Sequence, residues 1–292
     1  MLADLGASII KVEEPRGGDY ARHFPPLGGR MSGVFAALNR DKRGIVLDLK
    51  RPEGRDALLR LAARADVLIE SFRPGVMDRL GLGWDALHAA SPRLIVCSIS
   101  GFGQTGPLAE RAGHDLGYMA IAGLLGLGGR AGEVVQPGVQ TADIAGGALY
   151  GVVGILAALH QRATTGLGQR VDASMTDGAA GLGLMVHAKQ HLDQRPTAPG
   201  EDDLAGGRLC YRTWRCADGR WLAVGALEPK FWSTLCGAVG RTDLFPDGYA
   251  EGPRRDRVEV EIAALFASKT RDAWIEALAA YDVCVEPVLD PD

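Results

Sequence analysis

The chain has 292 residues, of which 47% are hydrophobic and 23% are charged, a composition typical of an ordinary soluble globular protein. This is enough apolar material for one large domain or two smaller ones with their own cores. The formal net charge of -4 gives no electrostatic argument for nucleic acid or a membrane surface as a partner, so an anionic ligand needs a local basic cluster.

The cysteines and histidines predict neither a disulfide framework nor a metal centre. The five cysteines and six histidines show no C-x-x-C pair and no spacing typical of metal ligands, which favours a reducing, cytoplasmic setting. No signal peptide is recognisable. No apolar stretch reaches the roughly 20 residues that span a bilayer, because the longest candidate, residues 144–160, is rich in glycine and alanine and ends in a histidine.

The first half of the chain alternates between strands and helices. Residues 1–6 indicate the last turn of a helix that Gly6 closes. The predicted strands and helices that follow are strands 7–12, 44–49, 66–72 and 94–99, and helices 52–64 and 84–90. Alternation of this kind, with nearly continuous apolar strands, predicts a parallel sheet that is covered on both faces.

A glycine-rich loop, residues 101–110, leads to the sequence "RAGHDLGYMAIAGLLG" and an apolar helix. A second, long helix of small residues starts at Asp143, residues 170–174 form a short strand, and a helix covers 175–194. A polar linker at 195–203 is the best internal boundary. After it come a hairpin with an Asp-Gly turn, strands 211–216 and 221–227, then helices 229–239, 254–268 and 271–281, and a last strand at 283–288.

These elements predict an α/β fold with two domains. Residues 1–195 form a large domain with a Rossmann-like parallel sheet, and residues 205–292 form a smaller α+β domain.

Three ionisable residues stand at element starts, and each has a plain structural explanation. His114 at a helix start is more often a hydrogen-bonded capping residue, although Asp115 beside it and the partial positive charge of the helix end favour a carboxylate and a neutral imidazole. Asp143 is either an N-cap or a carboxylate at an open helix entrance that holds an oxyanion. Glu228 is either a solvated loop residue or a carboxylate fixed at a junction.

Basic residues gather at strand and helix ends. Phosphates bind at such ends in parallel sheets, although charged ends are usually only solvated. These residues are Arg40, Lys42, Arg43, Lys50, Arg73 and Arg79.

Taken together, seven stretches resemble the type III CoA-transferase superfamily, and most closely its alpha-methylacyl-CoA racemase branch. The resemblance covers nearly the whole chain and implies the type III CoA-transferase fold. The stretches are "LADLGASIIKVEEPRGGD", "NRDKRGIVLDLK", "ADVLIESFRPGVMDRLGLG", "SISGFGQTGP", "AGHDLGYMAIAG", "QTADIAGGALYGVVGILAAL" and "GQRVDASMTDGAA".

The resemblance assigns a role to each ionisable residue. His114 stands where transferases of this superfamily usually carry a different residue and where racemases place one of two opposed bases. The resemblance therefore implies that His114 and Asp143 are the catalytic pair and that Asp115 belongs to the catalytic set. It also implies that Glu228 forms a hydrogen bond with His114 and adjusts its basicity. The helix start at Asp143 is then the expected stabiliser of the enolate.

The same resemblance implies a coenzyme A site, with coenzyme A as part of the substrate and with no tightly bound cofactor and no metal. Leu47, Asp48, Leu49 and Lys50, together with the loop from Gly113 to Tyr118, are expected to line the CoA and acyl path. Arg73 and Arg79 are expected near the nucleotide or the pyrophosphate. Glu14 stands where the family commonly has a basic residue, and Arg16 is expected to substitute for it.

The family likeness also bears on the ends of the chain and on its partners. Family members start with a further strand and end with a returning segment, so this chain is expected to be truncated at both ends. An interlocked homodimer acting in fatty acid metabolism is the expected form. A CoA transferase that uses Asp143 as the nucleophile, and an inactive CoA-binding dimer scaffold, remain as alternatives.

Overall fold

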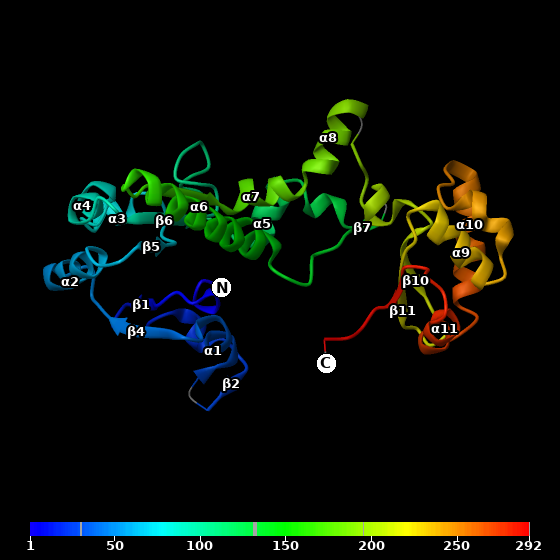
Figure 1. Cartoon of the computed structure of the whole chain (residues 1–292), viewed down its shortest axis with the longest axis horizontal. Helices are drawn as coiled ribbons and strands as arrows, with labels where there is room; N and C mark the ends of the chain where they lie inside the picture. Colours follow the sequence, from blue (N-terminus) through cyan, green and yellow to red (C-terminus); the bar gives the residue numbers. More distant parts are fainter. Residues whose placement is uncertain (30, 131–132, 195, 292) are drawn as a thin grey trace. The chain divides into compact units, whose positions relative to one another are not determined.

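The computed structural model describes residues 1–29, 31–130, 133–194 and 196–291. Contacts divide the chain into two compact units, and the first unit contains Met1–Ala122 and Gly138–Gly183, while the second contains Gly123–Pro137 and Leu184–Asp292. Figure 1 follows the chain through both units, from blue to red. The division into domains at residues 1–195 and 205–292 stays a prediction. Residues 195 and 292, the last residues of these two ranges, lie outside the described part.

The first unit is built on parallel strands. β1 (Ile9–Glu13) pairs with β4 (Lys42–Val46), and both are labelled in Figure 1. β5 (Val67–Glu70), β6 (Ile95–Ser100) and β9 (Arg170–Ser174) form a second ladder in the order β5-β6-β9. The predicted parallel strands are therefore confirmed, but as two ladders within the described residues rather than one sheet. β4 ends earlier than predicted because the Asp48 carboxylate accepts a hydrogen bond from the Lys50 N–H at 3.0 Å and turns the chain.

Helices connect these strands. They are α1 (Gly33–Asn39), α2 (Pro52–Ala62), α3 (Val76–Arg79), α4 (Trp84–Ala90), α5 (Asp115–Ile121), α6 (Tyr150–Thr165) and α7 (Met175–Leu182). Smaller elements are the 3₁₀ turns η1 (Ala3–Leu5) and η2 (Tyr20–His23) and the hairpin strands β2 (Leu27–Gly28) and β3 (Met31–Ser32). The expected helix end at residues 1–6 is confirmed as a short turn, because Gly6 has φ 94° and closes it.

The long apolar helix differs from its prediction. It starts at Ala142 with a π-helical segment, η4 (Ala142–Leu149), and continues as α6 to Thr165. It has 24 residues, and its mean hydropathy over an 18-residue window is 1.7, so by length and composition alone it could span a membrane. The expectation that no stretch reaches that length was therefore wrong. Its glycines lie against residues of β6, β9 and α7, and Ile155 is buried, so this is a sheet-covering helix of the α/β unit.

The helix predicted at 175–194 is two helices. α7 ends at Leu182, and α8 (Leu184–Asp193) begins after Gly183, whose N–H turns back to bond the Ala180 carbonyl at 3.0 Å. The break falls at the boundary between the two compact units.

The second unit is α+β, as the sequence indicates. β10 (Tyr211–Arg215), β11 (Trp221–Gly225) and β12 (Val285–Pro287) form an antiparallel sheet in that order. Besides α8, its helices are α9 (Pro229–Ala238), α10 (Gly252–Phe266) and α11 (Arg271–Leu278). Shorter elements are η3 (Leu125–Leu127), β7 (Gly129–Arg130), β8 (Glu133–Val134), η5 (Asp203–Gly207) and η6 (Thr242–Asp247).

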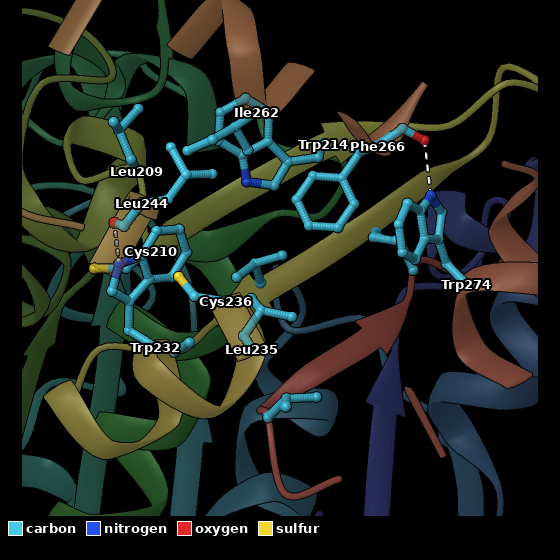
Figure 2. Packing of buried hydrophobic residues seen from close by; sticks show 14 of the residues in the cluster. Leu209, Cys210, Trp214, Trp232, Leu235, Cys236, Leu244, Ile262, Phe266 and Trp274 are labelled. Carbon is cyan, nitrogen blue, oxygen red and sulfur yellow. Dashed lines mark hydrogen bonds between the residues drawn. The ribbon is translucent and has the colours of Figure 1, made fainter. Parts of the chain in front are cut away.

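Aromatic residues form the core of this second unit, as Figure 2 shows. Phe266 is 1% exposed, stacks on Trp214 with ring centroids 5.9 Å apart, and meets Trp274 edge-on at 5.4 Å. The indole N–H groups of Trp232 and Trp274 donate to the carbonyls of Leu244 and Phe266, at 3.1 and 2.9 Å (Figure 2). These rings bury large apolar areas, and of the three indoles only that of Trp214 has no hydrogen-bond partner among the described residues.

Candidate active site

Two helix starts meet at one place in the first unit. His114 is the N-cap residue of α5, and Asp115 occupies its first turn. The Asp143 backbone N–H, in the first turn of η4, donates a hydrogen bond of 2.9 Å to Asp115 Oδ1. This bond joins residues 28 positions apart and brings His114, Asp115 and Asp143 to one site.

Close backbone contact between η4 and α7 fixes the position of Asp143. A β-carbon placed on Gly178 would lie 2.6 Å from the Gly146 Cα, and one placed on Gly147 would lie 2.8 Å from the Met175 Cγ. In one of the two interpretations of Asp143, the helix entrance was expected to be open. Gly146 and Gly147 instead are buried and let two helices approach closely.

The start of this helix has fewer free donors than expected. The Asp143 N–H is bonded to Asp115, and the Ile144 N–H donates to the Gln140 carbonyl at 3.0 Å. Both N–H groups are therefore occupied within the protein, and stabilisation of an enolate by this helix start stays a prediction.

The environment of Asp143 favours its protonated form. Burial, followed by the negative charge of Asp115, raises the pKa of the Asp143 carboxyl above its ordinary value, while the charge of His114 lowers it. His114 itself is exposed at the mouth of α5. An exposed imidazole therefore lies close enough to act by its charge on a carboxyl whose pKa is raised.

Tyr118 is held beneath this pair. Its side chain is 8% exposed and meets the ring of Phe102 edge-on at 5.1 Å. A β-carbon on Gly113 would lie 2.5 Å from the Tyr118 Cε1, so a glycine is needed there for the ring to fit. Burial raises the pKa of the Tyr118 hydroxyl, the charge of Asp143 raises it further, and Arg73 lowers it.

The site lies at the carboxyl ends of parallel strands. Arg73 follows β5, Gly101 follows β6, and α7 follows β9. The Thr176 hydroxyl and N–H both donate to the Gly101 carbonyl, at 2.7 and 3.0 Å, and so join the ends of β6 and β9. This edge is where ligands bind in open parallel sheets.

The residues expected along the CoA path fall into two groups. Arg73, Gly113 and Tyr118 belong to the site just described. Leu47, Asp48, Leu49 and Lys50 follow the carboxyl end of β4, and Arg16 follows that of β1. Because Glu13 pairs with Val46 in a parallel register, Arg16 and Lys50 lie at the same edge of that ladder.

The departure at Glu14 has a local explanation. The Glu14 carboxylate accepts a hydrogen bond from the Arg16 N–H at 2.9 Å and closes a turn at the end of β1. Next to it, the Glu13 carboxylate accepts from the Arg22 guanidinium at 2.7 Å and from the Asp19 N–H at 2.9 Å. These bonds shape the loop that carries Arg16.

Three other basic residues lie at the opposite end of β4. Arg40 bonds Asp4 at 2.9 Å, Arg43 bonds Ser8 at 2.8 Å, and Lys42 bonds Asn39 at 3.0 Å. They therefore do not join the basic residues at the carboxyl edge. Arg79 is exposed in the last turn of α3, after the loop that carries Arg73.

A cavity of about 170 Å³ lies beside the loop after β5. Arg73, Trp84, Gln104 and Arg170 are among the residues that line it. The Gln104 N–H donates to Asp172 Oδ2 at 2.9 Å, which holds the glycine-rich loop against β9.

Glu228 belongs to the second unit. It is the N-cap residue of α9, its side chain is exposed, and its charge acts on Tyr249 and Cys284 of the same unit. Its expected bond to His114 joins residues of different units and stays a prediction. Within the described residues, no group of three or more histidine, cysteine, aspartate or glutamate side chains could hold a metal ion.

Sequence reasoning missed Gly101, Phe102 and Thr176, which hold Tyr118 and the strand ends in place. The glycine in "SISGFGQTGP" was the available signal. However, a glycine that admits a ring and a glycine in a turn look the same in a sequence.

Comparisons with known proteins agree with this architecture. The family model described as CoA-transferase family III matches residues 1–292. Alpha-methylacyl-CoA racemase of Homo sapiens is 40% identical over 291 residues, covering 99% of this chain and 72% of that protein. An acyl-CoA transferase of Fusarium pseudograminearum is 39% identical over 301 residues, covering 94% of this chain and 63% of that protein.

Solved structures extend the likeness to the fold. The crystal structure of a CAIB/BAIF family protein from Brucella suis has a TM-score of 0.84 at 34% identity, covering 99% of this chain and 78% of that one. The predicted fold class, a parallel α/β part with a smaller α+β part, is thereby confirmed.

Proposed function

The chain belongs to CoA-transferase family III, and on that basis we propose that it is a CoA-thioester racemase or epimerase. Its substrate is a 2-methyl-branched acyl-CoA, whose α carbon it inverts. The proposal is supported by a relative of 40% identity that is named as such a racemase. It is also supported by the histidine that precedes Asp115 at the site.

Inversion needs two proton carriers. The proton next to the thioester carbonyl is acidic only because an enolate can form, and it has to leave on one face and return on the other. Neutral His114 takes the proton and becomes imidazolium, and protonated Asp143 gives one to the opposite face and becomes a carboxylate. In the reverse direction the two residues exchange roles.

The observation that carries the proposal is the geometry that brings His114, Asp115 and Asp143 together, with the Asp143 N–H bonded to Asp115 Oδ1 at 2.9 Å. Burial and the charge of Asp115 raise the pKa of the Asp143 carboxyl, which is the direction that suits a proton donor. General acid-base catalysis of this kind raises the reaction rate by about 10²–10⁴-fold. The rest has to come from positioning and from holding the enolate charge, and Arg73 is a cation at the same strand edge.

The remaining residues serve binding in this proposal. Arg16, Lys50, Arg73 and Arg79 supply positive charge for the CoA phosphates, and the segments Leu47–Lys50 and Gly113–Tyr118 line the CoA and acyl path. Glu228 tunes His114. Coenzyme A enters as part of the substrate without a separate cofactor, and the working form is a homodimer.

The test is proton exchange in deuterated water with one stereoisomer of a 2-methylacyl-CoA and no acceptor acid. The expected result is loss of optical activity together with deuterium at the α carbon. His114→Ala should still bind the acyl-CoA but lose the exchange. Unchanged exchange in His114→Ala would refute the assignment.

A second candidate is a CoA transferase in which the Asp143 carboxylate attacks the thioester. The acyl-CoA transferase relative at 39% identity favours it. In the same assay this enzyme turns over only when a second carboxylic acid is added. An intact dimer that binds CoA but does neither reaction would support the third alternative, an inactive scaffold.

A further inference from the structure

The first turn of α5 holds the first turn of η4 through a side chain that the chemistry of inversion does not require. Asp115 Oδ1 accepts the Asp143 backbone N–H at 2.9 Å. Building on the proposed function, we infer that Asp115 is a positioning residue for Asp143. Its carboxylate fixes the turn that carries Asp143 and places a second negative charge beside that side chain, without exchanging a proton with the substrate.

The hydrogen bond argues against Asp115 as a proton carrier. The N–H groups of a first helical turn have no partner within their helix, and an ionised carboxylate is a strong acceptor for one of them. A proton on Asp115 would weaken this bond, so using Asp115 as an acid or base would loosen the site at each turnover.

The charged groups around Asp143 determine how its pKa differs from the ordinary value. From α5, His114, Asp115 and Tyr118 act on or respond to Asp143. α7, β9, β6 and α6 also contact η4. Their charged or titratable residues are the exposed Asp177 and Asp172, with Arg170, Cys97, Tyr150, His160 and Arg162. Asp115 is thus the negative charge that opposes ionisation of Asp143, and His114 is the group that favours it.

Two substitutions separate the bond from the charge. Asp115→Asn keeps an oxygen that can accept the Asp143 N–H but removes the charge, whereas Asp115→Ala removes both. Asp56→Asn is the matched control, because it removes one negative charge from an exposed position of α2 in the same unit. The readout is the titration of the Asp143 carboxyl carbon by NMR in the ¹³C-labelled full chain, with the signal assigned by its loss in Asp143→Asn.

We expect the pKa of Asp143 to fall in Asp115→Asn and to stay unchanged in Asp56→Asn. We also expect Asp115→Ala to unfold at lower urea than Asp115→Asn, since only the alanine loses the bond. When Asp143 returns the proton, deuterium exchange in Asp115→Asn should decline at lower pH than in the parent protein. An Asp143 titration that is the same in Asp115→Asn and the parent overturns the inference, even if Asp115→Ala does not fold.

These outcomes separate the inference from the proposed function. If the parent protein exchanges no α proton but Asp115→Asn lowers the pKa of Asp143, the proposed function fails and the positioning role stands. If the parent exchanges the proton and Asp115→Asn loses activity with an unchanged Asp143 titration, the proposed function stands and the positioning role fails.

Discussion

Replacing Gly101 with alanine tests how Tyr118 is held in the site. The added methyl group would lie 2.5 Å from both Cζ and Oη of Tyr118, against about 3.5–4.0 Å for ordinary contact, so the ring has to move by about 1 Å. The ring is buried between Phe102 and Gly113 and has little room to move. Overpacking of this kind costs about 1–3 kcal/mol. A displacement of that size beside the reacting groups can lower the exchange rate about 100-fold.

Urea unfolding of four variants measures the cost: Gly101→Ala, Gly117→Ala, Tyr118→Leu and the double variant of Gly101→Ala with Tyr118→Leu. Gly117→Ala lies on α5 itself, where an added methyl group meets nothing within 4 Å, so it should stabilise the protein by about 0.5–1 kcal/mol. Gly101→Ala should destabilise it, and by less when Tyr118 is leucine, because the smaller side chain leaves space. The reasoning is refuted if Gly101→Ala costs the same with tyrosine or leucine at 118, or if it is as stable as Gly117→Ala.

Three further predictions concern stability. The Arg22 guanidinium holds the pKa of Glu13 at about 2, below the ordinary 4.5. Glu13→Gln should therefore be less stable by about 1–3 kcal/mol at pH 7. The deficit should shrink as the pH falls from 4.5 towards 2, which urea titrations at several pH values measure. Because burial raises the pKa of Asp143, the folded state binds the proton more tightly and this group destabilises the fold as the pH rises through its pKa. Asp143→Asn should thus gain melting temperature relative to the parent at pH 7 but not at acid pH. Phe266→Ala should cost about 3–5 kcal/mol, whereas exposed Phe245→Ala should change the unfolding midpoint little.

Periodicity and turn chemistry predicted most of the elements. The strand at 170–174 and the helix at 84–90 were predicted at their observed bounds, because a glycine-rich turn or a sharp change in apolar pattern marks both ends. The π-helical start at Ala142 was missed, since it results from contact with α7, which is distant in sequence. The break at Gly183 was missed because a single glycine is also tolerated inside a helix.

The sequence predicted which residues form the candidate site, but it did not predict the hydrogen bonds that join them. His114 and Asp143 are recognisable from the family's motifs, but the bond from the Asp143 N–H to Asp115 spans 28 residues and leaves no local pattern. The basic residues show the same limit. Arg43 and Lys50 look alike in the sequence, yet only the strand direction of β4 places them at opposite ends.

One property of Asp143 separates the two chemistries open to this family. A proton carrier must be protonated when it delivers its proton, so burial and a neighbouring carboxylate favour it. A nucleophile must be ionised, and the same surroundings oppose that state. Asp115 and the desolvation of Asp143 both act towards the protonated form, and His114 alone among the named groups acts against it. A titration in which the Asp143 carboxyl stays protonated at the pH of α-proton exchange would therefore indicate the proton carrier, and a carboxyl that is ionised at that pH would indicate the nucleophile.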